Sequence, residues 1–351
     1  MRMEDLDTPA LILYLDGLED NLNRYQRYFD EHSIGLRPHV KTHKCLAIAH
    51  MQMQKGAMGI TCQKLGEVEV MVAGGITGDV LVPYNIVGRQ KLERLAALAR
   101  QVKMNVAADS EYTVRGLAET AQREDVEIGV VVELGGGRTG VTSPQAAVDL
   151  GKRIDAAAGL EFRGLMVMPS PPEARAKIRE TLDLFDRAGL PHPIVSGGST
   201  PTALLAHEIP ELTEYRAGEY CVGGAAHLLR GTHTVEQCAL RVLTTVVSRP
   251  MPERAILDAG SKALSASTMQ IDAGSSMGYI VEYPEAHLSG ASEEHGHVDV
   301  SACASRPQIG KRVQVLPVHP CPCVNEFDEI AVVQEGRVEA VWPVHARGRS
   351  R

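Results

Sequence analysis

Three short stretches of this 351-residue chain carry side chains that could do chemistry. Lys41 stands in the basic stretch RPHVKTHK, Ser199 in the small-residue stretch SGGSTPT, and His319 in the stretch VHPCPCVN. A lysine that lies near other cations can have a lowered pKa, which suits it to form a Schiff base with a carbonyl group. A solvated basic loop is the alternative interpretation of the Lys41 stretch.

The SGGSTPT stretch has the composition of an anion-binding turn. It can present consecutive backbone N–H groups and two hydroxyls ahead of a helix that we expect to begin near Thr202. Helix N-termini and turns of successive N–H groups bind phosphate, although an ordinary loop has the same composition. A reactive lysine and a phosphate cradle in one barrel would together indicate a pyridoxal phosphate enzyme.

The VHPCPCVN stretch suggests a metal site. His319 and Cys321, two residues apart, supply an imidazole and a thiolate, which are ligands that zinc and similar ions accept. Two protein ligands leave positions open for water and substrate, as a catalytic site requires. Cys323 is either a third ligand or a packed thiol. Zinc is the first expectation for the metal, and manganese and magnesium remain open.

The elements that must position these residues follow a regular rhythm. From residue 34 onward, short apolar runs alternate with amphipathic stretches such as RQKLERLAALARQV at 89–102. Eight βα units are the number that closes a (β/α)₈ barrel, whose active site lies at the carboxyl ends of the strands. An open doubly wound sheet is the alternative, but the expected Gly-rich dinucleotide turn is missing. The eight predicted strands are 34–40, 58–62, 80–83, 104–107, 126–133, 161–167, 193–196 and 212–216.

After residue 235 the pattern changes to short β-rich runs without helices between them, which predicts an antiparallel β domain. We therefore expect residues 16–235 to form the barrel, and residues 1–15 and 236–351 to form a β domain that carries the metal site. The apolar strand at 10–15 is not needed to close the barrel and could pair with this β domain.

Composition excludes several other classes of protein. The net charge is −8 without a Lys/Arg run, so neither a nucleic acid nor an anionic membrane is an expected partner. No run of about 18 apolar residues is present, and acidic residues precede the first apolar run, which is the wrong order for a signal peptide. Seven scattered cysteines argue against a disulfide framework, so we expect a cytoplasmic protein.

Taken together, the motifs identify a family. RPHVKTHK, VSGGSTPT, LDAGSKALS, SEEHG and VEAVWPVHARG, in this order, resemble the D-threonine aldolase / D-serine dehydratase family of fold-type III, alanine-racemase-like enzymes. The resemblance runs from Asp7 to Gly348. It implies a pyridoxal phosphate-binding TIM barrel with a C-terminal antiparallel β domain, a divalent metal, a small D-amino acid substrate and a homodimer.

Carried over residue by residue, the resemblance also implies roles within the site. Lys41 would form the Schiff base with the cofactor, Arg138 would lie against its phenolic oxygen, and His319 and Cys321 would bind the metal. The phosphate would be held by Gly198, Ser199 and Thr200, with help from the backbone of Gly218 and Glu219.

Departures from the family pattern concern the substrate. Met168 stands where the family commonly has a tyrosine, and Tyr220–Gly224 replaces an aromatic-rich run. The His-x-Cys pair resembles dehydratases, whereas the tail VEAVWPVHARG resembles aldolases. Our first hypothesis is a lyase that dehydrates 3-hydroxy-D-amino acids such as D-serine or 3-hydroxy-D-aspartate, and the second is retro-aldol cleavage to glycine and an aldehyde. An amino-acid racemase and a non-catalytic cofactor carrier are the remaining alternatives.

Overall fold

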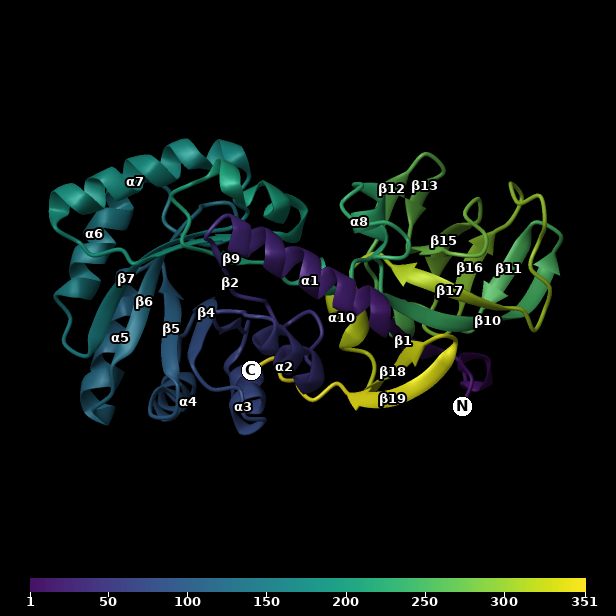
Figure 1. The fold of residues 1–351 in the computed structure, drawn as a ribbon, viewed down its shortest axis with the longest axis horizontal. Coiled ribbons are helices and arrows are strands. Elements are labelled where there is room, and N and C mark those ends of the chain that lie inside the picture. Colours follow the sequence, from purple (N-terminus) through teal and green to yellow (C-terminus); the bar gives the residue numbers. More distant parts are fainter. The chain divides into compact units, whose positions relative to one another are not determined.

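The computed structural model describes residues 1–351, which form two compact units (Figure 1). One, here called the barrel unit, comprises residues 24–41, 46–218 and 348–351. The other, here called the β unit, comprises residues 1–23, 42–45 and 219–347. The chain passes from one unit to the other at several points, among them the peptide bonds Lys41–Thr42 and Gly218–Glu219.

The barrel unit contains one parallel sheet of eight strands, in the order β2-β9-β8-β7-β6-β5-β4-β3. A parallel bridge between His39 and Thr61 joins the two ends of this order and closes the barrel. The eight predicted strands are therefore confirmed, with small shifts at their ends. The strands are β2 (Gly35–Leu36), β3 (Ile60–Thr61), β4 (Asp79–Asn85), β5 (Lys103–Ala108), β6 (Ile128–Leu134), β7 (Leu160–Val167), β8 (Ile194–Gly198) and β9 (Glu214–Arg216).

Helices follow the strands and lie on the outside of the sheet (Figure 1). Two of these helices begin after a serine that caps them: the Ser110 hydroxyl accepts a hydrogen bond from the Thr113 N–H, and the Ser143 hydroxyl accepts one from the Ala146 N–H. These bonds satisfy backbone N–H groups that the start of a helix leaves unpaired. The helix expected near Thr202 is a 3₁₀ helix, η3 (Thr200–Glu208). The others are α2 (Leu46–Gln54), α3 (Leu65–Ala73), α4 (Arg89–Ala99), α5 (Glu111–Glu124), α6 (Pro144–Asp155), η2 (Pro172–Ala174) and α7 (Arg175–Ala188).

The mostly apolar barrel interior contains a buried charged network around Arg37. Arg37 is almost completely buried, and its guanidinium lies 2.7 Å from Glu214 Oε2 and 2.8 Å from Asp79 Oδ1. Asn105 donates to the same Asp79 oxygen at 2.7 Å. A buried charge without partners is strongly destabilising, so this network allows polar groups inside the barrel.

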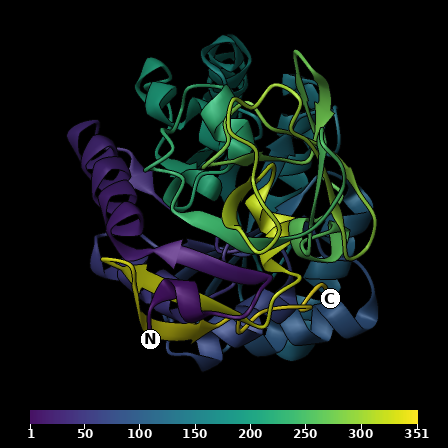
Figure 2. The same cartoon turned by 90° about the vertical axis from the view of Figure 1, so that its right-hand side faces the viewer.

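In the β unit, the N-terminal strand β1 (Ala10–Tyr14) lies between strands from the other end of the chain. It pairs antiparallel with β10 (Leu240–Met251) and parallel with β18 (Glu329–Gln334), and Figure 2 shows purple β1 beside the yellow C-terminal strands. The expected pairing of this strand with the C-terminal residues is confirmed. The sheet is mostly antiparallel but mixed, because β1 is joined to its neighbours by long connections that permit a parallel pair.

Asp258 connects the N-terminal segment with β10 in the β unit. The Thr8 hydroxyl donates to Asp258 Oδ2 at 2.6 Å, and the Thr244 hydroxyl donates to Asp258 Oδ1 at 2.6 Å. The remaining elements include η1 (Met3–Asp5), η4 (Glu219–Cys221), α8 (Ala225–Leu229), β11 (Arg254–Leu257), α9 (Ser261–Leu264), β12 (Met269–Ile271), β13 (Gly274–Ser276), β14 (Gly278–Ile280), β15 (His287–Ala291), β16 (Gly296–Asp299), β17 (Arg312–Pro317), α10 (Pro320–Val324) and β19 (Arg337–Pro343), whereas α1 (Leu15–Glu31) begins in this unit and ends in the barrel unit.

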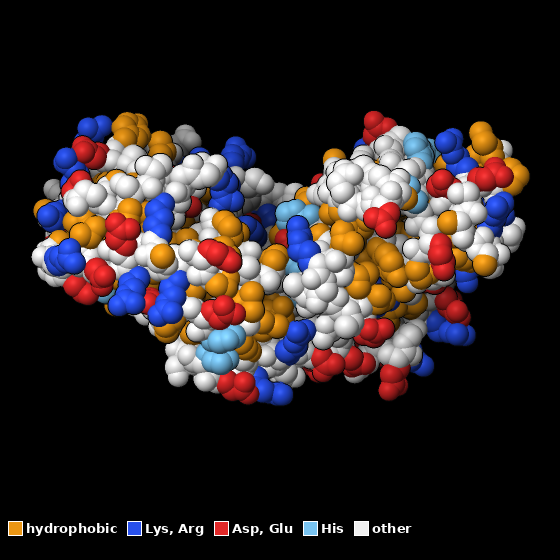
Figure 3. Space-filling model, turned by 90° about the horizontal axis from the view of Figure 1, so that it is seen from above, with side chains coloured by type: hydrophobic (Ala, Val, Ile, Leu, Met, Phe, Trp, Pro, Cys, Tyr) orange, Lys and Arg blue, Asp and Glu red, His pale blue; other side chains and the backbone are white.

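The surface carries charges of both signs. On the face that Figure 3 shows, basic and acidic side chains are interspersed rather than gathered into a stripe of one sign. None of the helices combines the length and the apolar character needed to cross a bilayer.

Candidate functional site

Lys41 lies just after β2, at the carboxyl end of the strand. Its Nζ is 3.5 Å from Oε1 of Gln63, which follows the neighbouring strand β3. The same oxygen is 3.1 Å from Nε2 of His39. Because a carboxamide oxygen only accepts hydrogen bonds, both groups donate to it, and the carboxamide therefore orients the lysine and the imidazole together.

His39 is an uncharged group in this environment. Burial, followed by the positive charge of Lys41, holds the pKa of His39 well below its usual value, and the hydrogen bond with Gln63 opposes this only in part. Its Nδ1 is buried and has no hydrogen-bond partner. An unpaired buried acceptor is costly, so the barrel unit has an unmet hydrogen-bonding position close to Lys41.

Two further charged residues lie at strand ends of the barrel. Arg216 ends β9 and donates to Ser196 O at 3.0 Å and Ser196 Oγ at 2.6 Å, and burial lowers the pKa of Arg216 to about 10. Glu133, near the end of β6, accepts a hydrogen bond from Thr139 at 2.9 Å, and burial raises the pKa of Glu133. Neither residue belongs to the sequence motifs above, although charged residues at the ends of predicted apolar strands are a visible signal.

The SGGSTPT stretch leaves β8 with little room for side chains. A Cβ on Gly198 would lie 3.0 Å from the Arg216 guanidinium and 3.2 Å from Met168 Sδ. The Gly198 N–H is already used, because it donates to Ser170 Oγ at 2.8 Å. Ser199 follows with φ 122°, a region that favours glycine, and Thr200 begins η3. The stretch is therefore a strained turn at the start of a helix, and its role in holding a phosphate stays a prediction.

Arg138 and Met168 lie at one pocket of the barrel unit, which has a volume of about 410 Å³. Arg138 is exposed, and the Met168 side chain is 39% exposed. Glu133 and Thr139 line the same pocket, and so does Lys177 of α7. The loops after β6 and β7 therefore bring together two residues that the sequence singled out, Arg138 and Met168.

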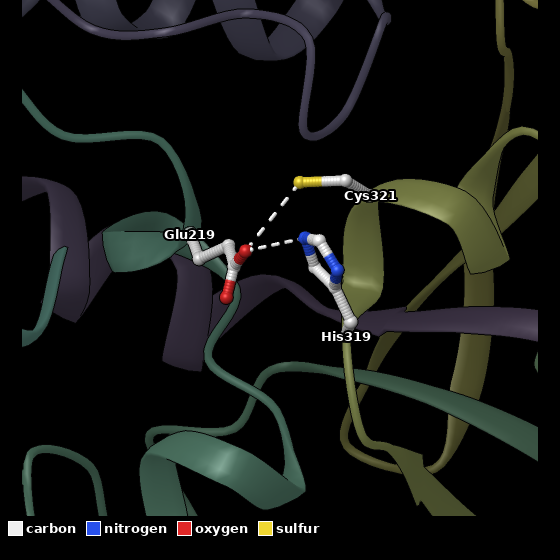
Figure 4. Close-up of side chains that lie close together, drawn as sticks. All are labelled: Glu219, His319 and Cys321. Atoms are coloured by element: carbon white, nitrogen blue, oxygen red, sulfur yellow. Dashed lines mark hydrogen bonds and ion pairs between the residues drawn. The ribbon is translucent and has the colours of Figure 1, made fainter. Parts of the chain in front are cut away.

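A second cluster lies within the β unit. Figure 4 shows the Glu219 carboxylate facing His319 and Cys321: Oε1 is 2.8 Å from His319 Nε2 and 3.5 Å from Cys321 Sγ. The candidate ligand atoms all lie within 4.8 Å of one another. His319 caps α10 and Pro320 occupies its first turn, a position that a proline's fixed φ favours. This short helix start holds the His-x-Cys pair.

The chemistry of this cluster fits a divalent metal ion. An imidazole, a thiol and a carboxylate are ligands of zinc-like ions. Burial would raise the pKa of Glu219, but hydrogen bonds from His227 and His319 outweigh it and hold that pKa well below its usual range. Hydrogen bonds with Cys321 and Glu219 raise the pKa of His319 to about 10. A bound ion would take the place of the protons that these groups share.

The structure also shows which of Cys323 and Glu219 lies in the cluster, a distinction that the sequence does not make. Cys323 is buried, and its thiol donates to Ala263 O at 3.1 Å, so it is a packed thiol outside the cluster. Glu219, expected to act through its backbone, has its side chain in the cluster. Its proximity to a pair 100 residues further along the chain is a property of the fold, and no spacing in the sequence signals it.

Family models match most of the chain. The model described as "Alanine racemase, N-terminal domain" matches residues 13–226, and a serine dehydratase domain model matches residues 239–333. D-threonine aldolase from Arthrobacter sp. is 33% identical, with 99% of this chain and 94% of that protein covered. D-threo-3-hydroxyaspartate dehydratase from Delftia sp. (strain HT23) is 31% identical, with 97% and 98% covered.

Solved structures agree with these matches. D-threonine aldolase from Filomicrobium marinum has a TM-score of 0.86 and 34% identity, with 99% of this chain and 98% of that chain covered. A cysteine-to-alanine variant of D-threo-3-hydroxyaspartate dehydratase, in the metal-free form, has a TM-score of 0.88 and 28% identity, with 98% of each chain covered. Alanine racemase from Clostridium difficile 630, at 13% identity with a TM-score of 0.68 and 96% and 99% covered, shares the fold.

These matches span both units, and they confirm the resemblance carried by the sequence motifs. The chain therefore belongs to the alanine racemase-like, fold-type III family of pyridoxal phosphate enzymes, and it is related to D-threonine aldolases and to 3-hydroxy-D-aspartate aldolases and dehydratases.

Proposed function

We propose that this protein is a pyridoxal phosphate- and metal-dependent lyase that dehydrates 3-hydroxy-D-amino acids of the D-serine or 3-hydroxy-D-aspartate type. The observation that supports it most is the His319–Cys321 pair, gathered with a carboxylate in a chain of this family. A D-threo-3-hydroxyaspartate dehydratase has been solved as alanine variants of a histidine and of a cysteine two positions later, the second in a metal-free form. The spacing is that of His319 and Cys321.

The residues of the barrel unit would hold the cofactor. We assign Lys41 to the Schiff base and Arg138 to the phenolic oxygen. The phosphate cradle consists of Gly198, Ser199 and Thr200, with the backbone of Gly218 and Glu219. The unpaired Nδ1 of His39 and the close approach at Gly198 are consistent with a bound group here. When bound, pyridoxal phosphate supplies an electron sink for negative charge at Cα, and the metal ion supplies a Lewis acid.

The remaining steps belong to side chains. Lys41, held beside Gln63, would take the proton from Cα of the substrate. His319 and Cys321 would hold the metal ion, of which zinc fits a thiolate and an imidazole best. The β-hydroxyl would leave as water, and the product would hydrolyse to an oxo acid and ammonia. Met168 removes a polar group from the pocket wall relative to a tyrosine, so its position would influence which substrates fit.

Product analysis tests this proposal. The purified enzyme, supplied with pyridoxal phosphate and Zn²⁺, is incubated separately with D-serine, D-threo-3-hydroxyaspartate and D-threonine. We expect an oxo acid and ammonia, loss of turnover after chelation, and no turnover of the L-enantiomers. Racemisation of alanine that survives a chelator would contradict the proposal and favour a racemase. A protein that binds the cofactor but turns over none of these substrates would favour a cofactor carrier.

Retro-aldol cleavage is the second candidate. D-threonine aldolases from two sources match this chain over 99% of its length at 33% and 34% identity. In that reaction a base would take the β-hydroxyl proton, and the Cα–Cβ bond would break. Glycine and an aldehyde in the incubations above would establish it in place of dehydration.

We also propose a homodimer, as the family resemblance implies. Light scattering of the purified protein, with the cofactor bound, should give twice the chain mass of 37.9 kDa. A monomer at working concentration would contradict this part of the proposal.

A further inference from the structure

The Glu219 carboxylate is shared between two groups of partners in the β unit. Its Oε1 is the oxygen that meets His319 Nε2 and Cys321 Sγ. Its Oε2 lies 2.6 Å from Nε2 of His227 instead. The two oxygens therefore have separate partners, and only Oε1 is directed at the candidate metal ligands (Figure 4).

His227 is held so that it can fix this carboxylate. It lies on the short helix α8, its side chain is 2% exposed, and its Nδ1 is 3.0 Å from the Thr232 hydroxyl. The Thr232 hydroxyl is also 3.2 Å from the His227 carbonyl oxygen, so it closes a small ring with that histidine. Because a carboxylate only accepts hydrogen bonds, His227 Nε2–H donates to Glu219 Oε2.

We propose that Glu219 is a third metal ligand, bound through Oε1, and that His227 is a positioning residue that keeps Oε2 away from the ion. The inference rests on the metal site of the proposed function and adds to it a ligand that the His-x-Cys motif does not contain. Metal ligands are commonly oriented by hydrogen bonds from outside the coordination shell, and here an imidazole would do this for a carboxylate.

Three protein ligands have a specific consequence for the ion. A tetrahedral site with three protein ligands keeps one position open for water or a substrate oxygen, as catalytic zinc sites do. The thiolate and the carboxylate together balance the charge of a divalent cation. A single carboxylate oxygen, one thiolate and one imidazole suit Zn²⁺ or Co²⁺, whereas Mg²⁺ requires octahedral oxygen coordination. We therefore expect the site to select Zn²⁺ or Co²⁺ over Mg²⁺.

Metal affinity, measured without substrate, tests the inference. Zn²⁺ is titrated into the cofactor-loaded, metal-stripped protein in competition with a chromophoric chelator, for the wild type, Glu219→Gln, His227→Ala and the double variant. We expect His227→Ala to weaken Zn²⁺ binding by about 10–100-fold, as loss of an outer partner does, and Glu219→Gln to weaken it more. His287→Ala is the matched control: this half-buried histidine of the β unit bonds the Ser275 carbonyl, away from the cluster, so the Zn²⁺ affinity of the variant should equal that of the wild type.

The double variant separates positioning from general loss of structure. If His227 acts through the carboxylate, His227→Ala should cost little further affinity in the Glu219→Gln background. Thr232→Val, which keeps the imidazole, should give a smaller loss than His227→Ala, and it supplies the test if His227→Ala does not fold. With Co²⁺, Glu219→Gln should alter the ligand-field bands while the sulfur-to-metal charge-transfer band remains.

Two results would overturn the inference. In the first, Glu219→Gln binds Zn²⁺ as tightly as the wild type. In the second, His227→Ala weakens Zn²⁺ binding as much in the Glu219→Gln background as it does in the wild type. Because neither measurement uses a substrate, a failure of the proposed lyase reaction would leave them unchanged. Loss of Zn²⁺ binding in Cys321→Ala, alongside unchanged binding in Glu219→Gln, would retain the metal site and reject only the third ligand.

Discussion

Glu133 in the barrel unit and Glu219 in the β unit are both shielded acids, and their pKa values shift in opposite directions. Burial raises the pKa of Glu133, and a threonine hydroxyl with the more distant charges of Arg138 and Arg216 offsets this only in part. Two imidazoles contact Glu219, and they hold its pKa well below the usual range although burial opposes them. Direct partners, more than burial, decide whether a carboxylate stays charged.

The two carboxylates illustrate two ways in which charges can be arranged before a ligand binds. The metal cluster keeps an anion in place before any cation arrives. In the barrel unit, burial instead disfavours charge: it holds the pKa of His39 well below its usual value and raises the pKa of Glu133. If this distinction holds, damage to one group should leave binding at the other intact.

The largest expected effect comes from Lys41→Ala. Loss of proton transfer alone should lower turnover by about 10²–10⁴-fold, and the visible absorbance of the covalently bound cofactor should disappear. Zn²⁺ content, measured by elemental analysis, should stay at the wild-type level. A Lys41→Ala protein that retains the absorbance would contradict the assignment of this lysine.

Cys321→Ala should give the converse result. We expect Zn²⁺ to be lost and turnover to fall by about 10²-fold or more, because a Lewis acid contributes several kcal/mol to such a barrier. The cofactor absorbance should remain. Cys323→Ala is the matched control: its thiol is packed against a carbonyl outside the cluster, so metal content should not change.

Glu133→Gln tests the pKa contrast through stability. A folded pKa above the unfolded value means that the folded protein disfavours the carboxylate, so the penalty is absent well below pH 4.5 and grows as pH rises. The variant should therefore gain stability over the wild type at pH 7, and this gain should vanish at acid pH. Urea unfolding of both proteins between pH 4 and pH 8 measures it. A gain that grows as pH falls would reverse the assigned direction.

The smallest effect is expected at the phosphate cradle. Ser199→Gly removes a side chain from a φ of 122°, which should stabilise the cofactor-free protein by about 1 kcal/mol after the greater flexibility of the unfolded chain is counted. Affinity for pyridoxal phosphate should fall only slightly, because the backbone N–H groups remain. Thermal unfolding with and without the cofactor distinguishes the two effects.

Much of the fold was accessible from the sequence, for identifiable reasons. The eight barrel strands are apolar runs bounded by polar turns, so periodicity located them, and even the short β2 and β3 coincide with predicted runs. The parallel pairing of β1 with β18 was not accessible, because alternation within a strand carries no information about the direction of its partner. The 3₁₀ geometry of η3 depends on its strained start at Ser199, which a helix signal does not reveal.

The candidate site divides in the same way. Lys41 and the His319–Cys321 pair are visible as local motifs, and the family match supports the context in which they were interpreted. The place of the Glu219 and His227 side chains beside His319 was not visible, because it arises only after chain segments about a hundred residues apart are brought together. Gln63, next to Lys41, is the intermediate case: it follows a predicted strand, but its contact with the lysine depends on barrel closure.

The position of β1 has a consequence for synthesis of the protein. Ala10 is made more than 200 residues before its partner Leu243, and the partners of Ile12 and Leu13 in β18 follow later still. At about 5–20 residues per second, the N-terminal strand waits on the order of 10–40 s for its first neighbour. All eight barrel strands, the last of which ends at Arg216, are made during this interval, so the sheet of the β unit closes after them, around a strand that was made before any of them.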